Sequence, residues 1–298
     1  MQNRTRNFLL FGHEIAAPVL DPALYLVATP IGNLSDITIR ALETLAAADV
    51  VAAEDTRVSR VLLSKYGIRQ KLVACHEHNE ASVSRRLVET VLNGGSVALI
   101  SDAGTPLVSD PGYRVVQDTI GQGLPVVAIP GPSAVLAALA VSGLPTDGFL
   151  FAGFLPAKAK ARRDRLAETA TAAMTMVFYE SPRRLAATLA DMADVLGEER
   201  MAVVARELTK RFEEVRRGNL RELSFHYKTE GAPKGEVVIC VGPAASAAEL
   251  SEEETDALLA KLAESMPASK AASEASTISG RPKRELYARL LALKENRQ

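Results

Sequence analysis

Short apolar runs rich in β-branched residues alternate along this chain with segments in which apolar residues recur every three or four positions. The first pattern predicts buried strands and the second predicts amphipathic helices. Because the two kinds of segment alternate, we expect right-handed βαβ units and a largely parallel sheet. The predicted strands are Leu24–Thr29, Val50–Ala53, Leu72–Cys75, Val97–Ile100 and Val126–Ile129, and the predicted helices are Thr38–Ala48, Val58–Tyr66, Ser82–Leu92, Pro111–Ile120 and Pro132–Val141.

A second α/β block begins near Phe149, after the turn-rich sequence "GLPTDG". Its strand-like segment Glu214–Arg217 indicates that part of this second sheet is antiparallel. The other predicted strands are Phe149–Phe154, Met174–Tyr179, Ala202–Arg206 and Glu236–Val241, with helices at Ala161–Ala170 and Arg183–Leu196.

Beyond Pro243 the composition changes to Ala, Ser and Glu, which is typical of a linker, and three short helical patterns follow. Their size resembles a helix-turn-helix module. We therefore predict an α/β protein with two α/β domains and a small C-terminal helical domain. The parts are a poorly ordered tail over 1–22, domains over 23–145 and 146–243, and the helical domain over 250–298.

The overall charge points to no particular partner. The formal net charge of the 298 residues is −1, although residues 150–243 hold 16 Lys and Arg against 13 Asp and Glu. This second block therefore permits an anionic partner without requiring one. Two cysteines, Cys75 and Cys240, are too few for a disulfide framework, and no apolar run is long enough to cross a membrane. A cytoplasmic protein with no membrane association is expected.

Three glycine- and proline-rich loops follow predicted parallel strands: Thr29–Asn33, Asp102–Gly112 and Pro130–Ala134. The second, within "SDAGTPLVSDPG", holds far more turn residues than a simple connection needs. In an open α/β sheet, ligands bind at the carboxyl ends of the strands. Glycine lets the backbone approach a ligand, and helix N-termini offer free N–H groups. The three loops together predict a binding cleft.

Several other site chemistries are disfavoured. No glycine loop ends in the Gly-Lys-Ser/Thr of a phosphate-binding loop, and the glycines of "GQGLPVV" precede a strand instead of following one. His76 and His78 lie two residues apart, but no further His or Cys cluster could complete a metal site around them. We interpret these histidines as loop residues and expect no metal.

Eight motifs in order, "LYLVATPIGNLSDITIRALETL", "AAEDTR", "SDAGTPLVSDPG", "PGPSA", "FAGFLP", "FYESPRRL", "ARELTK" and "PKGEVVICVGP", resemble one protein family. The chain is similar to the tetrapyrrole methylase superfamily, the class III S-adenosylmethionine-dependent methyltransferases. Within it, the chain most resembles the bacterial small-subunit (16S) ribosomal RNA cytidine 2′-O-ribose methyltransferases. Gly104-Thr105-Pro106 stands where tetrapyrrole-acting relatives usually have Gly-Asp-Pro, which favours the ribosomal RNA branch.

The resemblance implies S-adenosylmethionine as cofactor, a cofactor cleft between the two α/β domains, and a homodimer. It also implies a substrate, which is small-subunit ribosomal RNA or the assembled 30S subunit. Carried over by motif, the cofactor contacts are Pro30, Ile31, Asp102, Ala103, Gly104, Thr105, Val108, Ser133, Ala134, Tyr179, Leu208, Pro233, Lys234 and Gly235.

Methyl transfer to a hydroxyl needs mainly positioning of the reactants, together with a base or a cation near the developing alkoxide. A buried lysine can act as a base when burial lowers its pKa, and on this ground Lys210 and Lys234 are the favoured catalytic candidates. The alternative for each polar candidate in the motifs is a salt-bridged or solvated surface group. The other polar candidates in the motifs are Glu54, Asp55, Arg57, Glu180, Arg206, Glu207 and Glu236.

For RNA contact, five cations lie in the eight residues from Lys158 to Arg165: Lys158, Lys160, Arg162, Arg163 and Arg165. Such charges bind phosphates and position the nucleic acid. The alternative is a solvated basic helix. Two further functions stay open at this stage: a precorrin-type tetrapyrrole methyltransferase, and a non-catalytic nucleic-acid-binding protein.

Overall fold

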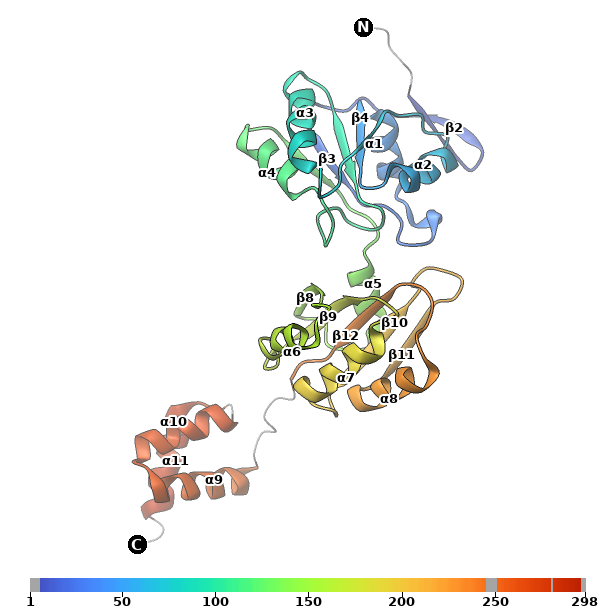
Figure 1. The fold of residues 1–298 in the computed structure, drawn as a ribbon. Helices are drawn as coiled ribbons and strands as arrows, with labels where there is room; N and C mark the ends of the chain where they lie inside the picture. Colours follow the sequence, from blue (N-terminus) through green and yellow to red (C-terminus); the bar gives the residue numbers. More distant parts are fainter. Residues whose placement is uncertain (1–5, 245–250, 280, 296–298) are drawn as a thin grey trace.

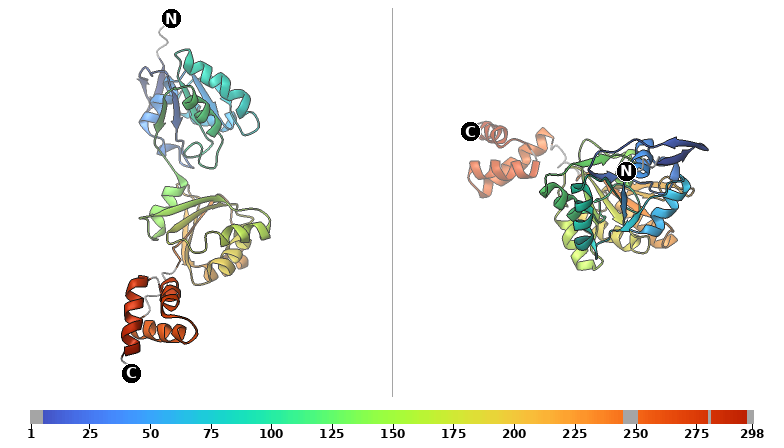
Figure 2. Two further views of the ribbon diagram at one scale, coloured as in Figure 1. Left: turned by 90° about the vertical axis from the view of Figure 1, so that its left-hand side faces the viewer. Right: turned by 90° about the horizontal axis from the view of Figure 1, so that it is seen from above.

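The computed structural model describes residues 6–244, 251–279 and 281–295. Two α/β lobes follow one another along the chain, and three C-terminal helices stand apart from both (Figures 1 and 2). The predicted fold class, two α/β domains and a C-terminal helical domain, is confirmed.

The first lobe contains a five-stranded, fully parallel sheet in the order β5-β4-β6-β3-β7. Its strands are β3 (Leu24–Val27), β4 (Val50–Ala53), β5 (Leu72–Ala74), β6 (Val97–Ile100) and β7 (Val126–Ile129). The helices are α1 (Ile39–Ala47), α2 (Thr56–Lys65), α3 (Glu80–Leu92) and α4 (Tyr113–Gly121), with a 3₁₀ turn at Leu34–Asp36. Neighbouring residues of β3 enter different cores, Tyr25 with α1 and Leu24 with α3 and α4. Both faces of the sheet are therefore covered, as the apolar character of the strands requires.

The second lobe contains a mixed sheet in the order β11-β10-β12-β9-β8, in which only β8 and β9 run parallel. Its strands are β8 (Phe149–Phe154), β9 (Thr175–Glu180), β10 (Met201–Arg206), β11 (Glu214–Asn219) and β12 (Val237–Val241). Helices α6 (Ala159–Ala167), α7 (Leu185–Leu196) and α8 (Leu220–Glu230) cover one face, and α5 (Ala134–Ser142) packs on the other. The core under α5 also takes in Ile31 from the first lobe and thereby joins the two lobes.

The prediction of a disordered tail over residues 1–22 is wrong for residues 7–16, which form a hairpin of β1 (Asn7–Leu10) and β2 (His13–Ala16). Phe11 and Gly12, with φ of 51° and 81°, make a two-residue turn of the kind that matches the twist of a hairpin. Phe8 is 1% exposed and packs in the core against α1, and the Leu9 N–H donates to the carbonyl of Tyr66 at 2.7 Å. The short apolar run thus belongs to the first lobe. Residues 1–5 lie outside the described residues.

Helices α9 (Glu252–Ser265), α10 (Ala268–Ser279) and α11 (Lys283–Glu295) enclose a small core of their own that includes Leu259, Ala272 and Leu286. Among the residues that the structure describes, none of the helices combines the length and the apolar character needed to span a bilayer.

Candidate active site

The three predicted loops converge because their strands, β6, β3 and β7, are neighbours in the parallel sheet. Backbone hydrogen bonds join two of them: the Thr29 N–H donates to the carbonyl of Gly104 at 2.8 Å, and the Gly104 N–H returns a bond of 3.0 Å to Thr29. Gly104 has a φ of +83°, and a Cβ built on it would lie 3.4 Å from Ile31. Glycine is favoured here because side-chain-bearing residues rarely adopt this left-handed backbone conformation.

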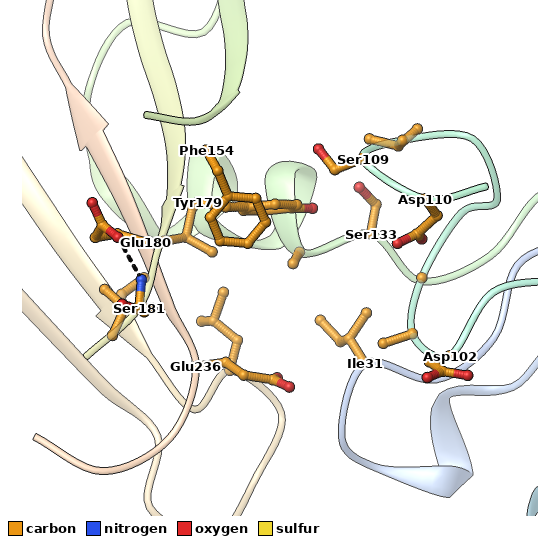
Figure 3. A pocket seen from close by; sticks show the side chains of 18 of the residues that line it. Ile31, Asp102, Ser109, Asp110, Ser133, Phe154, Tyr179, Glu180, Ser181 and Glu236 are labelled. Atoms are coloured by element: carbon orange, nitrogen blue, oxygen red, sulfur yellow. Dashed lines mark hydrogen bonds between the residues drawn. The ribbon is translucent and has the colours of Figure 1, made fainter. Parts of the chain in front are cut away.

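A cavity of about 440 Å³ lies between the lobes at the ends of these loops (Figure 3). In Figure 3, Ile31 and Asp102 of the first lobe lie across the space from Glu236 of the second lobe, whereas the carboxylate of Glu180 is turned away and accepts a hydrogen bond from the Ser181 N–H. Eleven of the residues predicted to contact a cofactor line it: Ile31, Asp102, Ala103, Gly104, Thr105, Val108, Ser133, Ala134, Tyr179, Leu208 and Gly235.

Pro30, Pro233 and Lys234 do not line this cavity, contrary to the prediction. Lys234 is exposed, and its carbonyl accepts a hydrogen bond from Arg206 at 3.1 Å. Its neighbour Gly235 has a φ of +97°, which turns the chain and brings Gly235 and Glu236, instead of Lys234, to the cavity. The motif placed the loop correctly, but only the turn decides which residues face inward.

The cavity is also lined by residues that the sequence did not assign to the cofactor. Asp110 could have been predicted from the sequence, since it belongs to the same loop as Asp102. The residues from β10 and β12 reach the cavity only because those two strands pair in the folded sheet. The additional residues are Glu54, Ser109, Asp110, Phe154, Glu180, Ser181, Pro182, Ala205, Glu236, Val237 and Val238.

Three carboxylates of the first lobe, Glu54, Asp102 and Asp110, lie close together at the cavity. Burial raises the pKa of all three. The negative charges of Asp110 and then Asp102 raise the pKa of Glu54 further, and the charge of Asp102 raises that of Asp110. Asp102 Oδ1 accepts a hydrogen bond from the Asp55 N–H at 3.0 Å, which holds the side chain in place. A ligand that carries positive charge would relieve this repulsion.

Aromatic rings form the side of the cavity on the second lobe. The ring of Tyr179 packs edge-on against Phe151 and Phe154, with centroids 4.9 and 5.5 Å apart. Burial, followed by the charges of Asp110 and Glu236, raises the pKa of Tyr179, so its hydroxyl stays protonated at neutral pH. Phe154 is 59% exposed and leaves a flat apolar surface open to a ligand.

Lys210 is a paired cation in this structure. Its Nζ lies 2.8 Å from Glu207 Oε1 and 2.9 Å from Glu236 Oε2. Burial alone would lower the pKa of Lys210, but the hydrogen bonds to both carboxylates outweigh it and raise the pKa. This is opposite to the direction that a lysine base requires, so the reasoning that favoured Lys210 as a base fails here.

Strained backbone is concentrated in the loops around the cavity, those that follow β6 and β10. Four non-glycine residues with positive φ lie beside the cavity: Leu107 (71°), Ser109 (68°), Glu207 (52°) and Thr209 (65°). Such conformations cost roughly 1–3 kcal/mol each and are retained mainly where function needs them.

The predicted RNA-binding run divides into two groups. Arg162 is 5% exposed, donates from Nε to Asp191 Oδ2 at 2.6 Å, and contacts the carbonyl of Ala157 at 3.2 Å. The prediction that Arg162 faces RNA is therefore wrong, because its helical position points into the α6–α7 interface. Arg163 pairs with Asp191 and Asp194.

The rest of the run remains on the surface. Arg165 is exposed and pairs with Glu168, while Lys158 and Lys160 are exposed at the start of α6. For the described residues no group of His, Cys, Asp and Glu is arranged to hold a metal ion.

Comparison with known proteins places this architecture in a class. The family model of Tetrapyrrole (Corrin/Porphyrin) Methylases matches residues 23–224, and the model of the RsmI C-terminal HTH domain matches residues 249–294. A solved uroporphyrin-III C-methyl transferase from Thermus thermophilus, complexed with S-adenyl homocysteine, shares the fold. Its TM-score is 0.52 at 20% identity, over 74% of this chain and 97% of that one. The family match over more than half of the chain makes it a member of this methylase class, and the solved structure shares its fold.

Curated relatives narrow the assignment. A Ribosomal RNA small subunit methyltransferase I from Mesorhizobium japonicum is 60% identical over 95% of this chain and 96% of its own length. The protein of that name from Vibrio cholerae is 48% identical over 89% of this chain and 93% of its own length. The chain therefore belongs to the ribosomal RNA small subunit methyltransferase I family. This confirms the family, the methyltransferase class and the two-lobed fold that the motifs predicted.

Proposed function

We propose that this protein uses S-adenosylmethionine to methylate small-subunit ribosomal RNA, at the ribose 2′-hydroxyl of a cytidine. The observation that carries the proposal is the cavity of about 440 Å³, which draws residues from both lobes and has three carboxylates on one side. Its volume is in the range of small-molecule sites. On the basis of the family resemblance, we also propose that the protein acts in the cytoplasm and forms a homodimer.

The residues present fit the cofactor. The carboxylates of Glu54, Asp102 and Asp110 suit a ligand that carries a sulfonium and an ammonium group, because either charge offsets the repulsion among them. Apolar side chains such as Leu208 and Val238 suit the adenine ring. The first N–H groups of α5, next to Ser133 and Ala134, suit the cofactor's carboxylate.

When bound, S-adenosylmethionine supplies a methyl group already activated on sulfur, and the sulfur leaves as a neutral thioether. The protein then has to hold the hydroxyl oxygen in line with that methyl group and to exclude water, and such positioning contributes roughly 7–11 kcal/mol. It also has to accept the proton of the hydroxyl. Asp102 lines the cavity as a carboxylate whose pKa is raised by burial, and it is better suited to accept the proton than Lys210, which is already a cation paired with Glu207 and Glu236.

Two measurements test the function. Calorimetric titration of the full-length protein with S-adenosylmethionine should give a saturable signal. Labelled methyl should then be incorporated into 30S subunits or 16S rRNA but not into a precorrin, and the labelled nucleotide should resist alkaline cleavage because its 2′-oxygen is blocked. Labelling of the precorrin alone, or of a base in place of the ribose, would refute the proposal.

A further inference from the structure

The segment that follows β10 reaches from the second lobe to the first beside the cavity. Thr209 Oγ1 accepts a hydrogen bond of 3.2 Å from the Asn33 N–H, which belongs to the loop after β3. The side chain of the next residue, Lys210, lies against Gly32 of the same loop. A Cβ built on Gly32 would be 2.4 Å from Cγ and 2.7 Å from Cε of Lys210. We call these four residues the interlobe contact.

Gly32 is needed in this contact for the space it leaves. Its φ lies outside the left-handed region, so the backbone conformation does not require glycine. A side chain at this position would instead take the place of the lysine stem. Because Cγ is close to the backbone of Lys210, the stem can avoid the added atom only if the whole side chain moves. Gly32 therefore serves the packing of Lys210.

Lys210 extends the interlobe contact to the wall of the cavity. Its Nζ lies 2.8 Å from Glu207 Oε1, and the same oxygen accepts a hydrogen bond of 3.1 Å from the Glu236 N–H. The Glu207 N–H in turn donates to the carbonyl of Glu236 at 3.0 Å. Gly235 and Glu236 line the cavity. Contacts thus connect Gly32 through Lys210 and Glu207 to the turn at the cavity.

Of the two ion pairs of Lys210, the one with Glu207 is the better shielded from water. The side chains of Lys210 and Glu207 are 26% and 17% exposed, whereas that of Glu236 is 74% exposed. The hydrogen bond from Lys210 lowers the pKa of Glu207, so this carboxylate is ionised at neutral pH. Charge-assisted hydrogen bonds are strong and directional, while exposed ion pairs contribute little. Glu207 is therefore the group through which Lys210 acts.

The same contacts account for the strained backbone of this segment. Glu207 and Thr209 have φ of 52° and 65°, and Leu208 between them lines the cavity. Strained conformations persist only where the surrounding contacts fix them. The hydrogen bond from Asn33 to Thr209 and the ion pair of Lys210 supply such contacts. Without them, Leu208 would lose its fixed place on the cavity wall.

We propose that Lys210 is a positioning residue for methyl transfer, which packs on Gly32, pairs with Glu207 and so holds the two lobes at the spacing that the methyl donor requires. The inference rests on the proposed function for the methyl donor and not for the RNA. It assigns Lys210 a role in the shape of the site and none in the transfer of the proton.

A double-variant cycle in the full-length protein tests the assignment. Lys210→Ala removes the ammonium group and the stem, Gly32→Ala displaces the lysine, and a third protein carries both changes. The matched controls are Lys228→Ala, at an exposed position of α8, and Gly121→Ala, where the added Cβ would meet open space. For each protein we would measure Tm, the Kd for S-adenosylmethionine by calorimetry, and kcat at saturating S-adenosylmethionine and 30S subunits.

The two single variants should weaken S-adenosylmethionine binding by a similar factor of roughly tenfold, the effect of losing one hydrogen bond between charged groups. Adding Gly32→Ala to Lys210→Ala should change Kd by no more than about twofold, because the side chain that the new methyl group displaces is already gone. At saturation kcat should fall by no more than about tenfold, since loss of a general base would cost roughly 10²–10⁴-fold. Both controls should bind and react as the wild type does.

Three outcomes would overturn the inference alone. An unchanged Kd in Lys210→Ala would do so even if Tm fell, because a merely structural role lowers only Tm. A fall in kcat of about a hundredfold or more at saturation, with Kd unchanged, would make Lys210 a catalytic residue. A full effect of Gly32→Ala in the Lys210→Ala background would show that Gly32 acts independently of the lysine.

Failure of the proposed function would look different. A wild-type protein that binds no S-adenosylmethionine would overturn that function and this inference with it. A wild-type protein that binds S-adenosylmethionine but labels neither 30S subunits nor 16S rRNA would overturn only the proposed substrate, because the Kd values of the cycle would still report on the interlobe contact.

Discussion

Arg162 offers the sharpest test of sequence against structure, because the charge pattern assigns it to RNA and the structure assigns it to the protein interior. Its side chain is 6% exposed and that of Asp191 is 13% exposed. Removing one partner of a buried ion pair costs roughly 3–5 kcal/mol. Asp191 keeps a contact to Arg163 at 3.2 Å, so Arg162→Ala should fall at the lower end, about 3 kcal/mol. If the two lobes melt together, this corresponds to a fall in Tm of roughly 6–12 °C.

Scanning calorimetry of the wild type, Arg162→Ala, Asp191→Ala and the double variant measures this effect and its coupling. The double variant should be less unstable than the sum of the two single variants, because the unpaired charge is then gone. Lys160→Ala is the control on the same helix, and its Tm should stay within about 2 °C of the wild type. If Arg162→Ala melted like the wild type while its KM for 30S subunits rose and lost salt dependence, the RNA assignment would be right and the structural one wrong.

Three further predictions concern the hairpin, the carboxylates and a turn. Phe8→Ala should destabilise the protein by about 3–5 kcal/mol, as for a core phenylalanine, and a change below 0.5 kcal/mol in a denaturation experiment would restore the idea of a loose tail. Since burial and then the charge of Asp102 raise the pKa of Asp110, its ionised form costs stability at neutral pH, and this cost disappears as pH falls below that pKa. Asp110→Asn should therefore raise Tm at pH 7 but not in acid, and should weaken S-adenosylmethionine binding roughly tenfold, whereas a lower Tm at pH 7 would contradict the sign. Gly235→Ala would place a Cβ 2.3 Å from the side chain of Glu207 and should reduce methyl transfer strongly. Gly231 has a similar φ and open space around it, so Gly231→Ala should change only the free energy of unfolding, by roughly 1–3 kcal/mol. Equal activity in these two variants would exclude a role for the contact with Glu207.

Local patterns predicted the elements well because each strand and helix carries its own periodicity. The run Val97–Ile100 is buried on both faces, as a continuous apolar run in a parallel sheet should be. The hairpin over Asn7–Ala16 was missed for the opposite reason. Its four-residue strands are too short to show a period, and Phe8 is held by long-range contacts with α1 and by the bond from Leu9 to Tyr66.

The sequence by itself determined the family, the order of elements and the loops that form the site, because turn residues and ordered motifs are local properties of the chain. Only the tertiary structure decided which side chains of those loops face the cavity and which charges remain available. Lys210 is a residue type that can serve as a base, but it forms ion pairs with Glu207 and Glu236. Arg162 is a residue type that can contact RNA, but it forms an ion pair with Asp191. The physical reason is that burial and ion pairing depend on residues distant in the chain. Asp191 lies 29 positions from Arg162, and Glu236 lies 26 positions from Lys210. Such tertiary contacts set both the pKa and the exposure of a side chain.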